Sequence, residues 1–73
     1  MASPSIAFGR RVRELREQRG WTQEDLAVRC SRHWTYIGGI ERGERNPTLR
    51  VISDLARSFG IPVRDLFPER GAK

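Results

Sequence analysis

The sequence has few of the residues that would indicate a secreted, membrane-spanning or metal-binding protein. It contains one cysteine, so no internal disulfide can form. Neither the first ten residues nor the rest of the chain has a long apolar run, which argues against a secretory signal or a membrane span and favours the cytoplasm. The single histidine, His33, lies three residues from Cys30, and one such pair without a second falls short of a zinc site. We therefore expect no metal and no cofactor.

Lysine is almost absent as well, although the chain is basic. Lys73 is the only lysine among 14 basic residues, and 9 acidic residues leave a net charge of +5. Arginine suits phosphate and guanine edges because its planar fork donates in pairs, although the base composition of the genome would explain the bias equally well. The charge points to an anionic partner, and nucleic acid is the first expectation. At 73 residues the chain is expected to form one domain, with its core over about 6–68.

The apolar spacing predicts an all-α fold of about five short helices, with no strand pattern. The first helix carries Phe8, Val12 and Leu15 on one face and stops at Gly20. The second starts after Thr22 and ends near Ser31, and the third covers about His33 to Arg42. The fourth runs from Thr48 to Gly60, and a last short helix follows from Pro62 to Pro68. The second and third helices, over about 22–42, match a helix-turn-helix, in which the second helix of the pair enters the DNA major groove.

Short sequence motifs sharpen this prediction. The chain resembles the Cro/CI-type (Xre-like) repressor family over about residues 8–67, in the segments Thr22 to Ala27, Thr35 to Ile37, Ile40 to Gly43, Arg45 to Leu49 and Asp65 to Phe67. Within that family, Tyr36 to Gly38 and Glu41 to Asn46 resemble the controller proteins of restriction-modification genes. The resemblance implies a compact lambda-repressor-like fold. It also implies a sequence-specific transcription regulator that binds a palindromic operator as a homodimer, with the third helix in the major groove.

The resemblance also assigns DNA-binding roles position by position. The residues implied are Gln23, Arg32, His33, Trp34, Thr35, Gly38, Gly39, Arg42, Arg45 and Asn46. Gln23 would face a phosphate at a helix N-terminus, Trp34 and Thr35 would meet base edges, and the loop after the third helix would grip the backbone. The alternatives are an exposed polar residue at Gln23, a Trp34 that folds back onto the protein, and a solvated loop.

Two positions depart from the family pattern. Gly38 and Gly39 stand where family members carry base-reading side chains, and each costs about 0.8–1.0 kcal/mol relative to alanine in a helix interior. These glycines would let the backbone approach DNA closely, or would pack against another helix or merely tolerate weak helicity. Ser31 and Arg32 replace the usual glycine and apolar residue of the central turn, so Arg32 is expected to point outward toward phosphate instead of into the core.

Structural roles follow from the same resemblance. Arg16 and Glu41 are expected to form a partly buried ion pair between the first and third helices. The dimer interface is expected near Val63, Leu66 and Phe67 and the Arg45 to Thr48 loop; the alternative is that the three apolar residues only cap the monomer core.

Other functions are weaker readings of the chain. An enzyme is not expected, because the only histidine and cysteine flank the start of the third helix and lack oriented partners. The main alternative is an antitoxin-like or other protein-interaction module with weak or secondary DNA binding. An activator would also contact RNA polymerase, for which the acids Glu14, Glu17, Glu24 and Asp25 do not single out a patch.

Overall fold

The computed structural model describes residues 3–67, so Pro68, expected to close the last helix, and the segment after it lie outside the described residues. The described chain forms the helices α1 (Pro4–Gln18), α2 (Gln23–Cys30), α3 (Trp34–Glu41) and α4 (Leu49–Phe59) and the 3-10 helix η1 (Val63–Leu66). The all-helical prediction is confirmed over these residues. The expected count of five helices is not confirmed, because the last of the five elements is a short 3-10 helix. The backbone is extended at Phe67, as is typical of a residue that precedes a proline.

Most helix boundaries follow from local sequence. The side-chain oxygens of Ser3, Thr22 and Thr48 accept hydrogen bonds from backbone amides in the first turns of α1, α2 and α4. At the other end, Gly20 and Gly60 adopt left-handed backbone angles, with φ of 71° and 72°, where the predicted stops lie. Side-chain caps and glycine stops act within a few residues, which explains why the sequence predicted the caps at Thr22 and Thr48 and the stops at Gly20 and Gly60.

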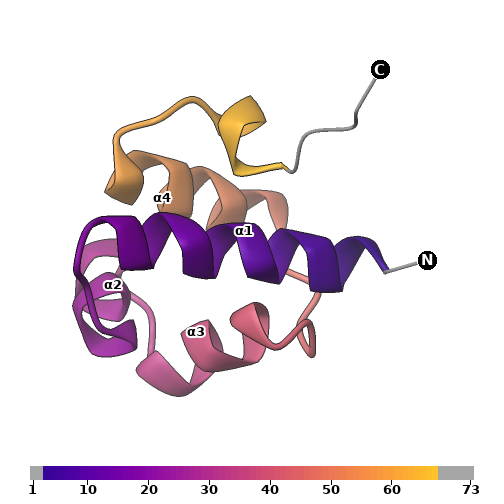
Figure 1. Cartoon of the computed structure of the whole chain (residues 1–73), viewed down its shortest axis with the longest axis horizontal. Helices are drawn as coiled ribbons and strands as arrows, with labels where there is room; N and C mark the ends of the chain where they lie inside the picture. The colour runs from indigo at the N-terminus through magenta and orange to yellow at the C-terminus, as the bar shows by residue number, and fades with distance from the viewer. Residues whose placement is uncertain (1–2, 68–73) are drawn as a thin grey trace.

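The helices pack around one apolar core. In Figure 1, α1 crosses the middle of the view with α4 above it and α3 below, and α2 closes the end away from the N-terminus. Contacts join α1 to α3, α2 to both α3 and α4, and η1 to α4 and α1. Every helix contributes buried side chains, among them Val12, Leu26, Ile37, Leu55 and Leu66. This arrangement leaves the N-terminal turn of α3 at the surface.

Helix α1 approaches the backbone of α3 so closely that only glycine fits at position 9. A Cβ on Gly9 would collide with the carbonyl oxygen of Ile40 and would lie 2.8 Å from that of Glu41. The sequence did not by itself assign this role to Gly9. The signal was a glycine inside a helical stretch, since an interior glycine is unfavourable and therefore often marks a close contact.

The turn between α2 and α3 is tight and strained at one residue. Ser31 has φ of 59° and ψ of 44°, the left-handed conformation that favours glycine. The amide of Arg32 donates to the carbonyl of Ala27 at 2.9 Å, which closes the end of α2. A serine is therefore held where glycine is favoured.

Residues 3–67 contain no candidate for a membrane span or a metal cluster. None of their helices is long and apolar enough to cross a membrane. Within the same residues, no group of three or more histidine, cysteine, aspartate or glutamate side chains is arranged to hold a metal ion.

Candidate nucleic-acid interface

A buried ion pair fastens α3 to α1. Arg16 Nε donates to Glu41 Oε2 at 2.7 Å and Arg16 Nη2 donates to Glu41 Oε1 at 3.1 Å. The Glu41 side chain is 3% exposed and that of Arg16 is 12% exposed. The hydrogen bond with Glu41 raises the pKa of Arg16, so the guanidinium stays charged. The expected Arg16–Glu41 pair is therefore present in the structure, and it connects the two helices on which the interface depends.

The same carboxylate orients the first residue of α2. Gln23 Nε2 donates to Glu41 Oε1 at 3.1 Å. Arg16 Nη1 donates to the carbonyl of Trp21 at 2.6 Å, which holds the chain leading into α2. Gln23 is only partly exposed, so it differs from the freely solvated polar residue of the alternative reading. Its amide lies at the N-terminus of α2 beside α3.

The start of α3 is capped by the only histidine. His33 Nδ1 accepts from the amide of Thr35 at 3.2 Å and lies 2.8 Å from Thr35 Oγ1. The sequence marked this start poorly, since histidine is not among the residues preferred as caps. Trp34 is 48% exposed, and its ring stacks on that of His33 with centroids 5.9 Å apart. The first turn of α3 therefore presents Trp34 and Thr35 at the surface.

The two glycines of α3 are covered by polar side chains of the interface itself. A Cβ on Gly38 would lie 3.1 Å from Arg42 Nη1 and 3.3 Å from Gln23 Oε1. A Cβ on Gly39 would lie 2.9 Å from Arg45 Cγ. At Gly38 this agrees in part with the alternative of packing against another helix, because Gln23 is the first residue of α2. The glycines make room on α3 for Gln23, Arg42 and Arg45.

The loop after α3 folds back over that helix. The guanidinium carbon of Arg45 lies 5.4 Å from the centre of the Tyr36 ring, a cation–π contact. Arg42 Nε donates to Glu44 Oε2 at 3.0 Å, and the pKa of Glu44 is lowered by this bond. Asn46 is exposed, at the edge of a small pocket that Phe8 and Phe67 also line. Among the predicted loop residues, Arg45 folds back over Tyr36 and Gly39 of α3.

Arg32 is placed differently from the other predicted DNA contacts. Its Nη2 donates to Asp54 Oδ2 of α4 at 2.9 Å, so the side chain is paired within the protein and points toward α4. Arg32 is therefore directed away from the core, as expected, but is paired with Asp54, and its contact with phosphate stays a prediction. An arginine can be accommodated at this usually apolar position because Asp54, on a helix packed against the turn, offers a carboxylate.

Of the three apolar residues predicted at the dimer interface, one is buried and two are partly exposed. Leu66 is completely buried in the core, so it follows the alternative reading in which these residues cap the monomer. Val63 and Phe67 are 38% and 43% exposed. The Phe67 ring lies 5.4 Å from that of Phe8. Leu49, which was not expected at the interface, is 77% exposed at the start of α4.

Two residues near the interface were missed from sequence. Tyr36 was noticed only as part of a motif, yet its ring supports Arg45. The only local signal for Asp54 was its spacing of three residues from Arg57 on a helix, and such a pair has a small effect on stability. Its bond to Arg32 joins residues 22 positions apart and has no local signature.

Comparison with known proteins places this geometry in a family. A family model described as a helix-turn-helix domain matches residues 7–68. The chain belongs to this helix-turn-helix domain family. The expected resemblance is thereby confirmed, and it extends to the controller proteins. Control protein C.BamHI of Bacillus amyloliquefaciens is 40% identical over 62 residues, which cover 84% of this chain and 76% of that relative.

A second control protein and a solved controller structure also match most of the chain. Control protein C.SmaI of Serratia marcescens is 40% identical over 62 residues, covering 85% of this chain and 74% of the relative. Among solved structures, the restriction-modification controller protein C.AhdI from Aeromonas hydrophila superimposes with a TM-score of 0.83. It is 45% identical, and the match covers 85% of this chain and 94% of that one. The helix-turn-helix formed by α2 and α3 is therefore embedded in a fold shared with controller proteins.

Proposed function

We propose that the chain is a controller-type transcription regulator that binds double-stranded DNA in a sequence-specific manner. The observation that carries this proposal is the surface formed around α3, where Gln23 from α2, the turn Trp34–Thr35 and Arg45 from the following loop gather beside one helix. In a helix-turn-helix, the second helix enters the major groove with its N-terminal residues at base edges. The likeness to controller proteins supports the same conclusion.

Roles within this surface follow from the contacts. Thr35 Oγ1 lies 2.8 Å from His33 Nδ1, so the hydroxyl proton is engaged there, whereas the hydroxyl oxygen can still accept a hydrogen bond from a base and the methyl can meet a thymine methyl. Trp34 adds exposed apolar area next to it. Gln23 and the amides at the start of α2 face a phosphate, and Arg42, Arg45 and Asn46 hold the backbone farther along. For Arg42 this requires exchanging Glu44 for phosphate, which is easy because both side chains are 60% exposed.

The proposal includes a homodimer on a palindromic operator, with half-sites about one helical turn apart. Exposed apolar side chains support it: Leu49, Val63 and Phe67 remain accessible. Two copies joined through these side chains would each present α3 to one half-site.

As an activator, the chain would also contact RNA polymerase through a surface that DNA leaves open. Glu14 and Glu17 are paired with Arg11 and Arg13 at 2.8 and 2.9 Å. Asp25 accepts from the amide of Thr22 in the cap of α2. Any acidic patch for polymerase therefore has little unpaired charge among these residues.

Selection of bound duplexes from a random DNA pool at near-physiological salt tests the proposal. We expect an inverted repeat bound at least about 10³-fold more tightly than a scrambled duplex. Thr35→Ala is expected to reduce this preference at the positions that Thr35 reads, whereas Ser53→Ala, an exposed substitution on α4, is the matched control. Weak, salt-sensitive binding without a motif would contradict the proposal and favour the protein-interaction module.

A further inference from the structure

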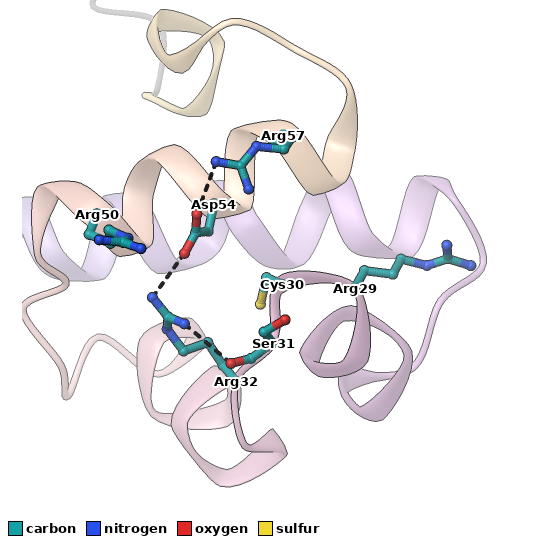
Figure 2. A pocket seen from close by; sticks show the side chains of 7 residues that line it. All are labelled: Arg29, Cys30, Ser31, Arg32, Arg50, Asp54 and Arg57. Atoms are coloured by element: carbon teal, nitrogen blue, oxygen red, sulfur yellow. Dashed lines mark hydrogen bonds and ion pairs between the residues drawn. The ribbon is translucent and has the colours of Figure 1, made fainter.

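A second basic site lies apart from the proposed base-reading surface. A pocket of about 490 Å³ opens between the C-terminal end of α2, the turn that follows it and the outer side of α4. Figure 2 shows this pocket with α4 in front of α1. Arginines of the turn and of α4 surround a single carboxylate, that of Asp54.

Asp54 organises the arginines on either side of it. Its Oδ2 accepts from Arg32 Nη2 at 2.9 Å, and its Oδ1 lies 3.2 Å from Arg57 Nη2. The Asp54 side chain is 14% exposed, whereas that of Arg57 is 74% exposed. Arg32 Nη1 also donates to the carbonyl of Ser31 at 3.2 Å. The carboxylate is thus set deep in the cluster, with two guanidiniums oriented around it.

The positive charge of the cluster exceeds what Asp54 neutralises. Arg50 lies beside the pair in Figure 2 and makes no hydrogen bond or ion pair with any residue of the 3–67 segment. Arg29 also borders the pocket, but its guanidinium lies 4.1 Å from the Trp21 ring centre and points away from Asp54. Three arginines therefore face one carboxylate. Uncompensated charge in a concave site concentrates the potential and attracts anions.

The donor arrangement favours a tetrahedral anion. Arg57 uses one of its nitrogens on Asp54, and Arg50 has all of its donors free within the described chain. Guanidinium forks bind phosphate through pairs of charge-assisted hydrogen bonds. A phosphate group offers several acceptor oxygens in different directions, which suits arginines that approach from the turn and from two positions on α4. A planar carboxylate would meet fewer of them.

We propose that this pocket binds a phosphate group, with Arg50 and Arg57 as its ligands and Asp54 as the residue that positions Arg57 and Arg32. The phosphate comes from one of two sources. The first is a DNA backbone phosphate outside the base-contacting half-site, since Arg32 directly precedes the His33 cap of α3; this source rests on the proposed function. The second is a small phosphorylated molecule, which does not depend on that function.

Titration of the full chain with pyrophosphate at constant ionic strength tests the shared chemistry. The arginine Nε–Hε signals of Arg50 and Arg57 are expected to shift saturably in proton–nitrogen correlation spectra. The double variant Arg50→Gln/Arg57→Gln is expected to weaken binding about tenfold or more, because it removes the charge-assisted bonds. The matched control, Arg10→Gln/Arg13→Gln on α1, removes the same charge from exposed positions and is expected to leave the affinity unchanged.

Duplexes of two lengths distinguish the sources. One ends at the selected operator, and the other extends it by about half a helical turn at each end. If the phosphate belongs to DNA, the Arg50→Gln/Arg57→Gln variant loses affinity on the longer duplex only, and its salt slope falls by about 0.9 for each phosphate that the variant no longer binds. If it belongs to a small molecule, the variant affects pyrophosphate binding alone. Failure to find an operator would contradict the proposed function and leave the pyrophosphate result intact. The phosphate site is overturned if pocket and control variants behave alike with both probes.

Asp54→Asn tests the positioning role. The substitution raises the net charge of the pocket, so a purely electrostatic site would bind pyrophosphate more tightly. If Asp54 orients the arginines, binding weakens instead and the Nε–Hε signals of Arg32 and Arg57 lose their distinct positions. Tighter binding with unchanged arginine signals would overturn that role.

Discussion

At the scale of single residues, Glu41 connects α1 to the proposed DNA-binding surface. Its carboxylate accepts from Arg16 on α1 and from Gln23 at the start of α2. Because the side chain is almost fully buried, the ion pair is shielded from water and salt. Removing the Glu41 charge would take away the carboxylate that accepts two hydrogen bonds from Arg16 and leave only the longer contact to Glu17, at 4.0 Å.

Glu41→Gln is therefore expected to lower the free energy of unfolding by about 3–5 kcal/mol, the cost of stranding a buried charge. Urea denaturation monitored by circular dichroism measures the change. Glu14→Gln is the control, because Glu14 is 56% exposed and its pair with Arg11 is of the weak surface kind. Equal effects of the two substitutions would show that the Arg16–Glu41 pair contributes no more than a surface pair.

Ser31 illustrates strain at a single position. Its left-handed backbone costs about 1–2 kcal/mol for a residue other than glycine, and part of any gain is offset by the greater freedom of glycine in the unfolded chain. Ser31→Gly is expected to raise the free energy of unfolding by about 1 kcal/mol. Ser31→Ala keeps the strain and is expected to bring no gain. A loss of stability in Ser31→Gly would mean that the serine hydroxyl contributes an interaction worth more than the strain.

At the scale of elements, the start of α2 depends on reciprocal capping. Thr22 Oγ1 accepts from the amide of Asp25 at 3.0 Å, and Asp25 Oδ2 accepts from the amide of Thr22 at 2.8 Å. This second bond lowers the pKa of Asp25. A group whose pKa is lower in the folded state contributes stability above its unfolded pKa, and the contribution disappears as the pH falls through the folded-state value.

The stability advantage of the wild type over Asp25→Asn is thus expected to be constant from neutral pH down to about pH 5 and to shrink below about pH 4. Asparagine does not titrate, so the comparison isolates this carboxylate from the other acids. Urea denaturation at a series of pH values measures it. An advantage that is independent of pH would show that the carboxylate charge does not stabilise the cap.

Helix α3 gives up helix propensity to accommodate Arg45. Gly39→Ala gains about 0.8–1.0 kcal/mol of propensity but displaces Arg45 from the Tyr36 ring, an interaction worth about 0.5–1 kcal/mol. Stability is therefore expected to change little, while affinity for the selected operator falls about tenfold because Arg45 no longer reaches its phosphate. Combining Gly39→Ala with Arg45→Ala in a double-mutant cycle tests the link. Additive losses would show that Gly39 acts independently of Arg45.

The helix boundaries show what local sequence predicts about elements. Thr22 and Thr48 were predicted as caps, and Gly20 and Gly60 as stops, because such signals act within three or four residues. The start of α3 was poorly marked, since capping by His33 depends on the orientation of its ring. The last element became a 3-10 helix, a distinction that apolar spacing over four residues does not make.

At the scale of the whole molecule, the exposed apolar side chains bear on the proposed dimer. Phe67→Glu and Val63→Glu each place a charge in that area and are expected to convert a dimer into a folded monomer, measured by sedimentation equilibrium with circular dichroism as the folding check. Two variants are used because Phe67 also packs on Phe8. Val28→Glu is the control, since Val28 is 80% exposed on α2, outside the proposed interface. If all three variants have the mass of the wild type, Val63 and Phe67 are not at the interface.

The sequence by itself determined the helical class, most helix limits and the family, and the resemblance to that family implied the Arg16–Glu41 pair. Apolar periodicity, caps and short motifs involve residues that are close in sequence, so they can be recognised without knowing how the helices cross. Only the tertiary structure decided that Arg32 pairs with Asp54, that Arg45 covers Gly39 and that Leu66 belongs to the core. Each of these depends on which side chains separate helices bring together. That placement results from packing the whole core and leaves no signature in neighbouring residues.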